Sequence, residues 1–244
     1  MSERFFVSAP ILENGVTLSG TEAHHLTVVG RRRPGDTVTL FDGSGAEFQA
    51  RLRTVARDEV QLELLARTKI SRELPGCLVL ASALPKGDRQ RWLVEKAVEL
   101  GVARFIPLLA ERSIVRPHSV RLDRLRRTVI EASKQCGRNT LMEIDPPREG
   151  KTVLASSSDS GRRWLADPSA ASFDSVVADP IPSEARPGQI TVAIGPEGGF
   201  TDEERAVAVQ AGWTCYRLGP RTLRIETAAL SFCTLAVGFL SRGS

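Results

Sequence analysis

The hydrophobic pattern of this chain changes near residue 77, and the change separates two kinds of structure. Over residues 4–70, apolar and polar side chains alternate, as they do in strands that bury one face. One alternating segment, residues 37–41, is followed by Asp42-Gly43-Ser44-Gly45, which favours a tight hairpin turn. A short helix is expected near residues 22–29. The N-terminal part is therefore expected to form a small barrel or a curled sheet.

From Cys77 onward, short continuous apolar runs alternate with segments of helical period. Buried strands are expected at the apolar runs, which are residues 78–84, 105–109, 190–194 and 214–218. Helices are expected at residues 88–100, in the basic stretch after residue 112, from about residue 202, and at residues 227–240. Such alternation is typical of a parallel α/β sheet. We expect domains at residues 1–72 and 73–244, with a linker near residues 71–76.

Composition excludes several classes of protein. Of the 244 residues, 41% are hydrophobic and 25% are charged, as in ordinary globular proteins. Every apolar run is shorter than the roughly 20 residues that span a bilayer, and the N-terminal sequence is too short and too polar for a signal peptide. We expect a cytoplasmic protein without membrane contact. The four cysteines lie far apart, which favours buried free thiols over a metal site, because zinc ligands usually occur in close pairs.

The positive charge is concentrated in the middle of the chain. Residues 76–150 hold 14 Lys/Arg against 9 Asp/Glu. A helical reading of the basic stretch gives an apolar stripe at Leu122, Leu125, Val129, Ala132 and Cys136. The same reading places four basic residues on another face: Arg124, Arg127, Lys134 and Arg138. Such a face is either an ordinary solvated surface or the binding site of a polyanion.

A glycine-rich loop follows the strand expected at residues 190–194. Its sequence, Gly195-Pro196-Glu197-Gly198-Gly199-Phe200-Thr201, allows positive φ angles and close backbone approach to a ligand. Thr201 and Glu204 have the spacing of a capping box, so a helix begins just past the loop. Ligands in parallel sheets bind beyond the carboxyl ends of strands, where this loop falls. It is either a ligand site or a plain turn, and it is not a nucleotide-phosphate motif.

A second junction lies at residues 218–228, before a helix that is apolar nearly all round and therefore buried. Arg224 and Glu226 stand beside it, where a charge needs a partner or a function. They form either an ion pair, with the carboxylate favoured by the helix dipole, or part of a catalytic site. In a third segment, Leu84-Pro85-Lys86-Gly87-Asp88-Arg89, Asp88 is expected to cap a helix. Lys86 is either simply exposed or placed to meet RNA phosphate.

Taken together, these motifs resemble the bacterial RsmE family. The segments LPKGDRQRWLVEKAVELGV, EASKQCGRN, IGPEGGFTDEE and LGPRTLRIETAAL occur in that order, behind an RFFV start and HHL…RRRPGD…LFDG. The resemblance implies methylation of N3 of a uridine in 16S ribosomal RNA of the small subunit, with S-adenosyl-L-methionine as methyl donor and no metal. It implies a PUA-like RNA-binding barrel before a SPOUT domain, a Rossmann-like parallel sheet with a C-terminal trefoil knot. It also implies a homodimer.

The resemblance further implies roles for individual residues. Arg224 would stabilise charge on the uracil, and Glu226 would remove the N3 proton or orient Arg224. The cofactor would be held by Ile194, Gly195, Pro196, Glu197, Gly198, Gly199, Leu218, Gly219, Pro220, Leu223, Thr227 and Ala228. RNA would be bound by Arg4, Arg31, Lys86, Arg124, Arg127 and Arg138. Gly30 departs from the family, which usually has leucine there, and is expected to loosen its helix or turn.

Two other functions remain open from the sequence. One is an RNA-binding protein without catalysis, whose C-terminal domain serves only for dimerisation. The other is a methyltransferase for a different base or a different RNA, because surface shape decides the target. Cofactor binding distinguishes the first from an enzyme, and mapping of modified nucleotides distinguishes the second.

Overall fold

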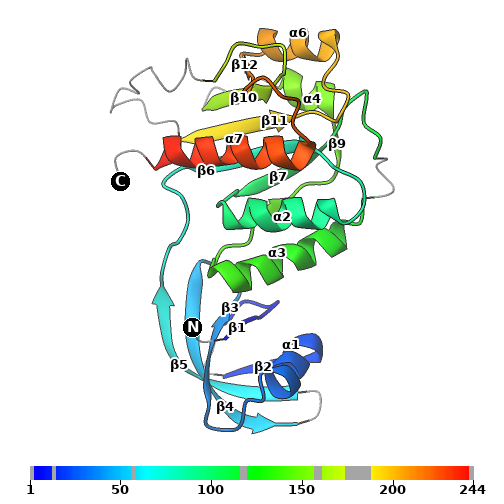
Figure 1. Cartoon of the computed structure of the whole chain (residues 1–244). Coiled ribbons are helices and arrows are strands. Elements are labelled where there is room, and N and C mark those ends of the chain that lie inside the picture. The colour runs from blue at the N-terminus through cyan, green and yellow to red at the C-terminus, as the bar shows by residue number, and fades with distance from the viewer. Residues whose placement is uncertain are drawn as a thin grey trace. The chain divides into compact units, whose positions relative to one another are not determined.

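The computed structural model describes residues 3–12, 15–56, 59–115, 120–156, 161–173 and 188–241. Two packed units emerge from its internal contacts, and Figure 1 shows their helices and strands. The first unit combines Met1–Glu73 with Ile130–Leu141, and the second combines Leu74–Val129 with Met142–Ser244. Within the described residues, no helix is long and apolar enough to cross a membrane.

A curled sheet forms the first unit. In its described residues the strand order is β1-β3-β4-β5-β2. The strands are β1 (Arg4–Phe6), β2 (Gly15–Ser19), β3 (Thr37–Phe41), β4 (Ala46–Val55) and β5 (Glu59–Lys69). β1 pairs parallel with β3 and the other pairs are antiparallel, with register shifts between β4 and β5 that bend the ladder. The predicted hairpin is confirmed, since Gly43 and Gly45 join β3 to β4 with positive φ.

The predicted short helix is also confirmed, in two parts. α1 (Gly20–His24) runs directly into a π-helical turn, η1 (His25–Val29), which ends at Gly30. A side chain at Gly30 would meet the carboxylate of Glu3, because an ideal Cβ there lies 2.6 Å from its Oε2. Glu3 in turn pairs with Arg32 at 3.1 Å. The Glu3–Arg32 ion pair therefore occupies the space that a leucine side chain at position 30 would fill.

Residues 130–141 belong to the first unit because their polar side chains find partners there. Arg138 donates from Nε to Glu73 at 3.1 Å, and Lys134 donates to Glu22 at 2.9 Å. The Asn139 amide donates to the carbonyl of Ile70 at 3.0 Å. These contacts join the end of a helix that begins in the second unit to the sheet of the first.

A parallel sheet forms the second unit, as predicted. In its described residues the order is β12-β10-β11-β6-β7-β8, and β9 also pairs with β7. The strands are β6 (Cys77–Ala83), β7 (Arg104–Leu109), β8 (Glu143–Ile144), β9 (Arg148–Glu149), β10 (Arg162–Ala166), β11 (Gln189–Ile194) and β12 (Thr214–Tyr216). All of these pairs are parallel. Strand β10, which lies between β11 and β12, was not predicted from the sequence, and neither were the two-residue strands β8 and β9.

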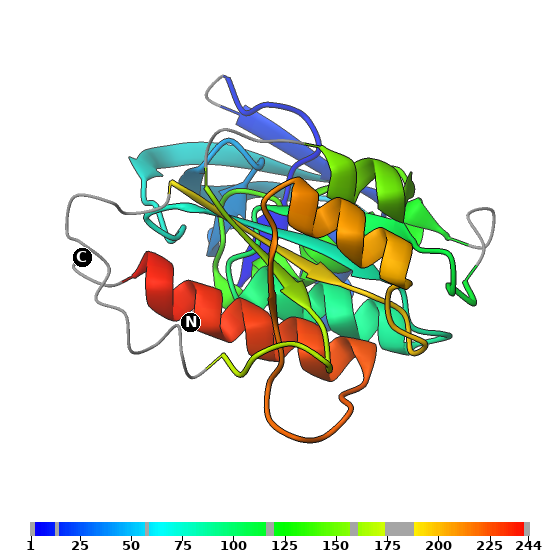
Figure 2. The ribbon, with the colours of Figure 1, turned by 90° about the horizontal axis from the view of Figure 1, so that it is seen from above.

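Helices cover both faces of this sheet. They are α2 (Arg89–Glu99), α4 (Gly150–Ala155), α6 (Asp202–Gln210) and α7 (Ile225–Leu240). A further helix, α3 (Leu122–Cys136), begins in the second unit and ends in the first. Figure 2 shows α2 and α7 on one face and α4 and α6 on the other. Adjacent residues of β10 pack on opposite faces of the sheet. Trp164 packs edge-on against Phe239 of α7, and Leu165 belongs to the hydrophobic cluster under α4 and α6. Burying a side chain of this size contributes roughly 1.5–3 kcal/mol.

Two helix starts differ from the predictions. Asp88 precedes α2, but its side chain makes no capping hydrogen bond, since its carboxylate pairs instead with Arg124 at 3.0 Å. The last helix begins at Ile225 rather than Thr227, with Arg224 as its N-cap residue. Glu226 therefore lies inside the first turn of α7, where the helix dipole favours a carboxylate.

Candidate active site

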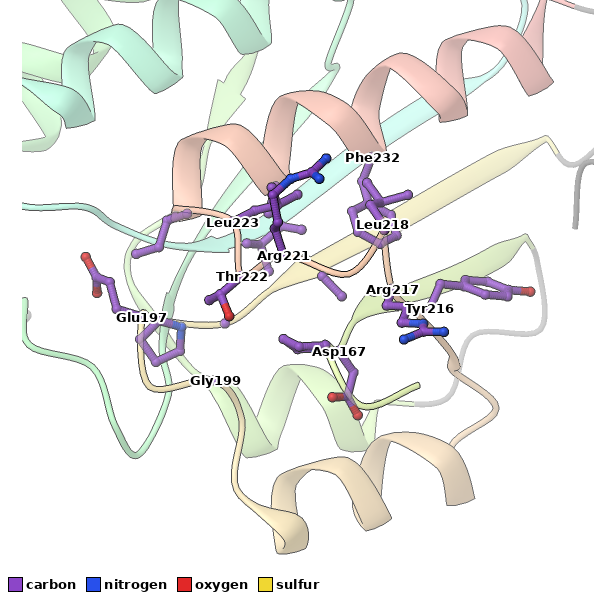
Figure 3. A pocket seen from close by; sticks show the side chains of 18 residues that line it. Asp167, Glu197, Gly199, Tyr216, Arg217, Leu218, Arg221, Thr222, Leu223 and Phe232 are labelled. Atoms are coloured by element: carbon purple, nitrogen blue, oxygen red, sulfur yellow. The ribbon is translucent and has the colours of Figure 1, made fainter. Parts of the chain in front are cut away.

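A pocket opens where three neighbouring strands of the parallel sheet end together. β12, β10 and β11 are adjacent, and the loops that follow their carboxyl ends form its walls. The space measures about 600 Å³ and opens to solvent (Figure 3). Carboxyl ends of parallel strands are where open α/β sheets bind ligands. Phe232 of α7 and Leu218 of the loop after β12 reach it from the side of α7.

Most of the predicted cofactor residues line this pocket. They are Ile194, Gly195, Pro196, Glu197, Gly199, Leu218, Gly219, Leu223 and Ala228. Gly198 lines a neighbouring hollow instead. Pro220 and Thr227 are exposed and lie outside the lining found among the described residues. The pocket therefore unites two loops that are about 20 residues apart in the sequence.

Further lining residues were not predicted. They are Ala166 at the end of β10 with Asp167 and Pro168 after it, and Tyr216, Arg217, Arg221, Thr222, Ile225 and Phe232 around the second loop. The second group lies beside residues that were predicted, so the sequence of the loop from 217 to 223 could have indicated these further lining residues. The first group depends on β10, whose sequence RRWLA lacks a clear strand pattern. Asp167 is buried and accepts hydrogen bonds from the backbone and hydroxyl of Ser169.

Two glycines shape the floor of the pocket. Gly199 has φ 68° and Gly219 has φ 70°, in the left-handed region that favours glycine. A Cβ at either position would project into open space, with no atom within 4 Å. The backbone is therefore bare where a ligand would lie. With apolar walls from Leu218, Leu223 and Phe232, this arrangement suits a flat nucleoside that is held by backbone hydrogen bonds.

The glycine-rich loop is held at both ends by the segment after β7. The predicted capping box is confirmed: the Thr201 hydroxyl accepts from the Glu204 amide, and Glu204 accepts from the Thr201 amide at 2.8 Å. Glu204 is buried, and its other carboxylate oxygen accepts from the amide of Glu111 at 3.0 Å. Arg112 donates from Nη1 to the carbonyl of Gly198 at 2.8 Å. Residues 111 and 112 thus fix the loop that forms one wall of the pocket.

Arg224 and Glu226 differ in their surroundings. Arg224 is exposed, between the lining residues Leu223 and Ile225. Glu226 is buried, and its Oε1 accepts from Nη1 of Arg89 at 3.1 Å. Its Oε2 is also buried and has no hydrogen-bond partner among the described residues. Glu226 therefore pairs with Arg89 of α2, rather than with Arg224 as the orienting role required.

The predicted RNA-binding residues divide into two groups. Arg31, Lys86, Arg124 and Arg127 are exposed. Lys86 and Arg124 line a hollow of about 930 Å³ together with Arg91 and Arg121. This hollow is strongly basic, although Asp88 also contributes to it.

Arg138 and Lys134 do not lie on an exposed basic face, contrary to the prediction from helical spacing, and Arg4, which was expected to bind RNA, is also mostly covered. Arg138 is buried and its guanidinium pairs with Glu73. Arg4 is mostly covered, pairs with Glu47 at 2.9 Å and stacks over Phe41. Lys134 is likewise covered and paired with Glu22. Helical spacing assigned Arg138 to the same face as Lys134, but α3 ends at Cys136 and Gly137 has φ 84°, so Arg138 lies past the helix. Arg4, Lys134 and Arg138 each form an ion pair in the first unit.

The cysteines are free, as expected, but only Cys233 is buried, and Cys77, Cys136 and Cys215 are partly exposed. Cys233 is buried in α7, and burial raises the pKa of its thiol to about 12. Burial is also the main cause that raises the pKa of Cys77 and of Cys215. Within the described part of the chain, no group of three or more histidine, cysteine or acidic residues is arranged to hold a metal ion.

Comparisons with known proteins decide the family. The profile of the RNA methyltransferase domain matches residues 72–237, and that of the RNA methyltransferase PUA domain matches residues 18–65. A protein of Bacillus subtilis (strain 168), named ribosomal RNA small subunit methyltransferase E, is 34% identical over 221 residues, which cover 88% of this chain and 86% of that protein. The chain belongs to the ribosomal RNA small subunit methyltransferase E family.

Other members of the methyltransferase E family match over nearly as much of the chain. The protein of that name from Synechocystis sp. (strain ATCC 27184 / PCC 6803 / Kazusa) is 35% identical over 219 residues, covering 89% of this chain and 71% of its own. The crystal structure of the Neisseria gonorrhoeae enzyme, bound to S-adenosyl methionine, has a TM-score of 0.84 and 32% identity, and the match covers 96% of both chains. The expected PUA domain and methyltransferase domain are both confirmed.

Proposed function

We propose that this protein methylates N3 of a uridine in 16S ribosomal RNA of the small subunit, with S-adenosyl-L-methionine as methyl donor, in the cytoplasm. The observation that carries the proposal is the pocket at the ends of β12, β10 and β11, with its bare glycine backbone and apolar walls. A solved relative from Neisseria gonorrhoeae binds S-adenosyl methionine, which supports this ligand for the pocket.

The residues of the pocket fit the nucleoside part of the cofactor. Leu218, Leu223 and Phe232 offer apolar surface to adenine. The backbone of residues 194–199 and 218–219 offers donors and acceptors to the ring edge and the ribose, since Gly199 and Gly219 have no side chain there. When bound, the cofactor supplies a methyl group on a sulfonium, which is already an activated leaving group.

The chain itself must favour the uracil anion, because neutral N3–H is a poor nucleophile. Arg224 is exposed beside the pocket and would stabilise negative charge on O2 or O4 of the base. Glu226 is assigned a positioning role, since its carboxylate is buried and hydrogen-bonded to Arg89. It would hold Arg89, which is about 41% exposed, in place on α2.

We further propose how the two parts of the chain divide the work. Residues 1–72 would form the PUA-like RNA-binding part, and residues 73–244 the SPOUT part, whose C-terminal segment threads a trefoil knot. The profile of the RNA methyltransferase domain, which matches residues 72–237, supports the assignment of this part. Arg31, Lys86, Arg124 and Arg127 would contact RNA phosphates, since all four are exposed.

A homodimer is proposed from the free face of α7. This face carries the exposed small residues Thr227, Thr234 and Gly238, beside the half-exposed Leu230 and Leu235. Small side chains let a second helix approach closely, and a two-fold partner is the commonest cover for such a face. Sedimentation at micromolar concentration should give twice the 26.5 kDa mass of the chain, and a monomer would contradict the proposal.

The experiment that tests the function compares ribosomes from cells with and without this enzyme. Nucleotide mapping should find one N3-methyluridine in 16S rRNA that disappears without the protein and returns when it is supplied. A methylated base of another kind, or in another RNA, would show a different target. If no modification changed and calorimetry detected no S-adenosylhomocysteine binding at millimolar concentration, the chain would be an RNA-binding protein without this activity.

A further inference from the structure

The basic hollow of about 930 Å³ lies at the start of α2, apart from the pocket at the ends of β12, β10 and β11. One side is formed by residues between 86 and 91, and the other by residues 114 and 115 and the start of α3. All of these residues belong to the second unit. Among the described residues, none lines both the hollow and the pocket, so the hollow is a separate space.

Most of the cations in this hollow have no anionic partner. Within the part of the chain that the structure describes, Lys86, Arg91 and Arg121 form no ion pair, although all three are exposed on the rim of one hollow. Neighbouring arginines differ, since Arg89 pairs with Glu226 and Arg126 pairs with an aspartate of its own helix. Like charges that converge on one space repel each other, and an anion between them relieves that repulsion.

The fourth cation, Arg124, is held by Asp88. Its Nη2 donates to the Asp88 carboxylate at 3.0 Å, and for this reason the carboxylate does not cap α2. The two side chains are 61% and 92% exposed. Ion pairs as exposed as this one contribute little free energy, so another anion can readily replace the carboxylate. Asp88 therefore occupies a position that an incoming anion would take.

The hollow also has an apolar part. Ile114 lines it with 53% of its surface exposed, beside the partly buried Val115 and the buried Leu125. A phosphate group alone would leave this apolar surface in water. A nucleotide would cover it with its sugar and base, because both have apolar faces. The combination of clustered cations and an exposed apolar side chain therefore suits a nucleotide rather than a simple anion.

We propose that this hollow binds one nucleotide of the RNA, and that Asp88 competes with its phosphate for Arg124. The phosphate lies among the four cations, and the sugar and base lie over Ile114. Because the phosphate must displace Asp88, the carboxylate keeps RNA affinity below the value that the cations alone would give. Weaker binding favours release of the methylated product. The inference rests on the proposed function for the identity of the polyanion, but it is tested by RNA affinity rather than by methylation.

The test titrates the full-length protein into a fluorescently labelled single-stranded oligouridylate and follows anisotropy across a salt series. Asp88→Asn should raise the affinity at low salt about three- to tenfold, because it removes the competing charge. Arg121→Ala and Arg124→Ala should each lower the slope of log affinity against log salt by about one. Ile114→Ala should weaken binding without changing that slope, since it removes apolar contact and no charge.

Asp123→Asn is the matched control. Asp123 is 89% exposed and pairs with Arg126 at 3.4 Å, much as Asp88 pairs with Arg124, but it does not line the hollow. This variant changes net charge by the same amount as Asp88→Asn and should alter RNA affinity much less. If the two variants raise affinity equally, only net charge acts and Asp88 is no competitor.

Three further results would overturn the inference. Wild-type slopes for Arg121→Ala and Arg124→Ala would show that the hollow does not contact phosphate. Unchanged affinity for Ile114→Ala would show that no nucleotide covers this side chain. A wild-type protein that does not bind the oligouridylate at low salt would remove the ligand altogether. If the expected pattern of affinities appeared but nucleotide mapping found no N3-methyluridine, the proposed reaction would fail while the nucleotide site would stand.

Discussion

Arg89, the first residue of α2, donates a hydrogen bond to Glu226 in the first turn of α7, at 3.1 Å. The second oxygen of that carboxylate is buried and unpartnered among the described residues. Leaving such an oxygen unpaired costs about 1–3 kcal/mol. The pair joins two helix N-termini beside the pocket at the ends of β12, β10 and β11. For this reason we propose that Glu226 positions Arg89 rather than transferring a proton.

If Glu226 acts through Arg89, the two residues form one functional unit. Glu226→Gln and Arg89→Ala should then slow methyl transfer by similar factors, and the double variant should be no slower than either single one. S-adenosylhomocysteine affinity should be unchanged. Single-turnover rates across a pH series check this. A Glu226→Gln defect that recovers at high pH, where uracil ionises unaided, would instead identify Glu226 as the proton acceptor.

Arg224→Ala should lower the rate of methyl transfer by about 10²–10³, the usual loss for one charge-stabilising donor. Cofactor affinity should change little, because Arg224 is exposed beside the pocket and does not belong to its lining. Single-turnover assays with saturating cofactor and RNA measure the effect. A near-wild-type rate would show that another group stabilises the uracil anion.

The features that the sequence predicted correctly are local ones. The capping box of Thr201 and Glu204 depends on residues three apart, and the strand before it is a continuous apolar run. Strand β10 was missed because two arginines begin its five residues, and only tertiary packing buries Trp164. The partner of Glu226 was missed because Arg89 lies 137 residues away in the sequence. Likewise, helical spacing was extended to Arg138, but α3 ends at Cys136, and the partner Glu73 lies 65 residues away in the sequence.

Two neighbouring glycines should respond differently to substitution. Gly199→Val should abolish S-adenosylhomocysteine binding, because φ 68° is strained for a β-branched residue and the side chain would enter the pocket. Gly198→Ala should weaken binding less, since its Cβ would meet the flexible side chain of Arg112 at 3.3 Å. Calorimetry on both variants checks the order. Equal losses would mean that the loop tolerates no change at either position.

RNA affinity should fall steeply with salt, and Arg124→Ala and Arg127→Ala should each reduce the slope of log affinity against log salt by about one. The control is Arg138→Ala, which should leave the slope unchanged. That variant should instead lower the free energy of unfolding by roughly 3 kcal/mol, because it leaves Glu73 without its buried partner. Wild-type slopes in both surface variants would identify that face as merely solvated.

Cys233 should make stability depend on pH in the alkaline range. Its pKa is about 12 in the folded protein against an ordinary value of 9.0, so only the unfolded thiol ionises between these values. The stabilisation that the buried neutral thiol gives the folded protein is fully present below the pKa of the thiol in the unfolded chain. It is lost as pH rises toward the pKa in the folded protein. Between about pH 8 and about pH 10, the free energy of unfolding should therefore fall more for the wild type than for Cys233→Ala. Parallel slopes would contradict the burial effect.

The assignment of Ile130–Leu141 to the first unit has a consequence for biosynthesis. Residues 1–73 emerge from the ribosome first, but Glu73, Glu22 and the carbonyl of Ile70 accept hydrogen bonds from Arg138, Lys134 and Asn139, which are synthesised later. The RNA-binding sheet therefore cannot complete its packing until more than half of the chain has been synthesised. A fragment that ends at the domain linker would remain less stable than the same residues in the whole protein. This ribosomal RNA methyltransferase thus completes its own RNA-binding part late in translation.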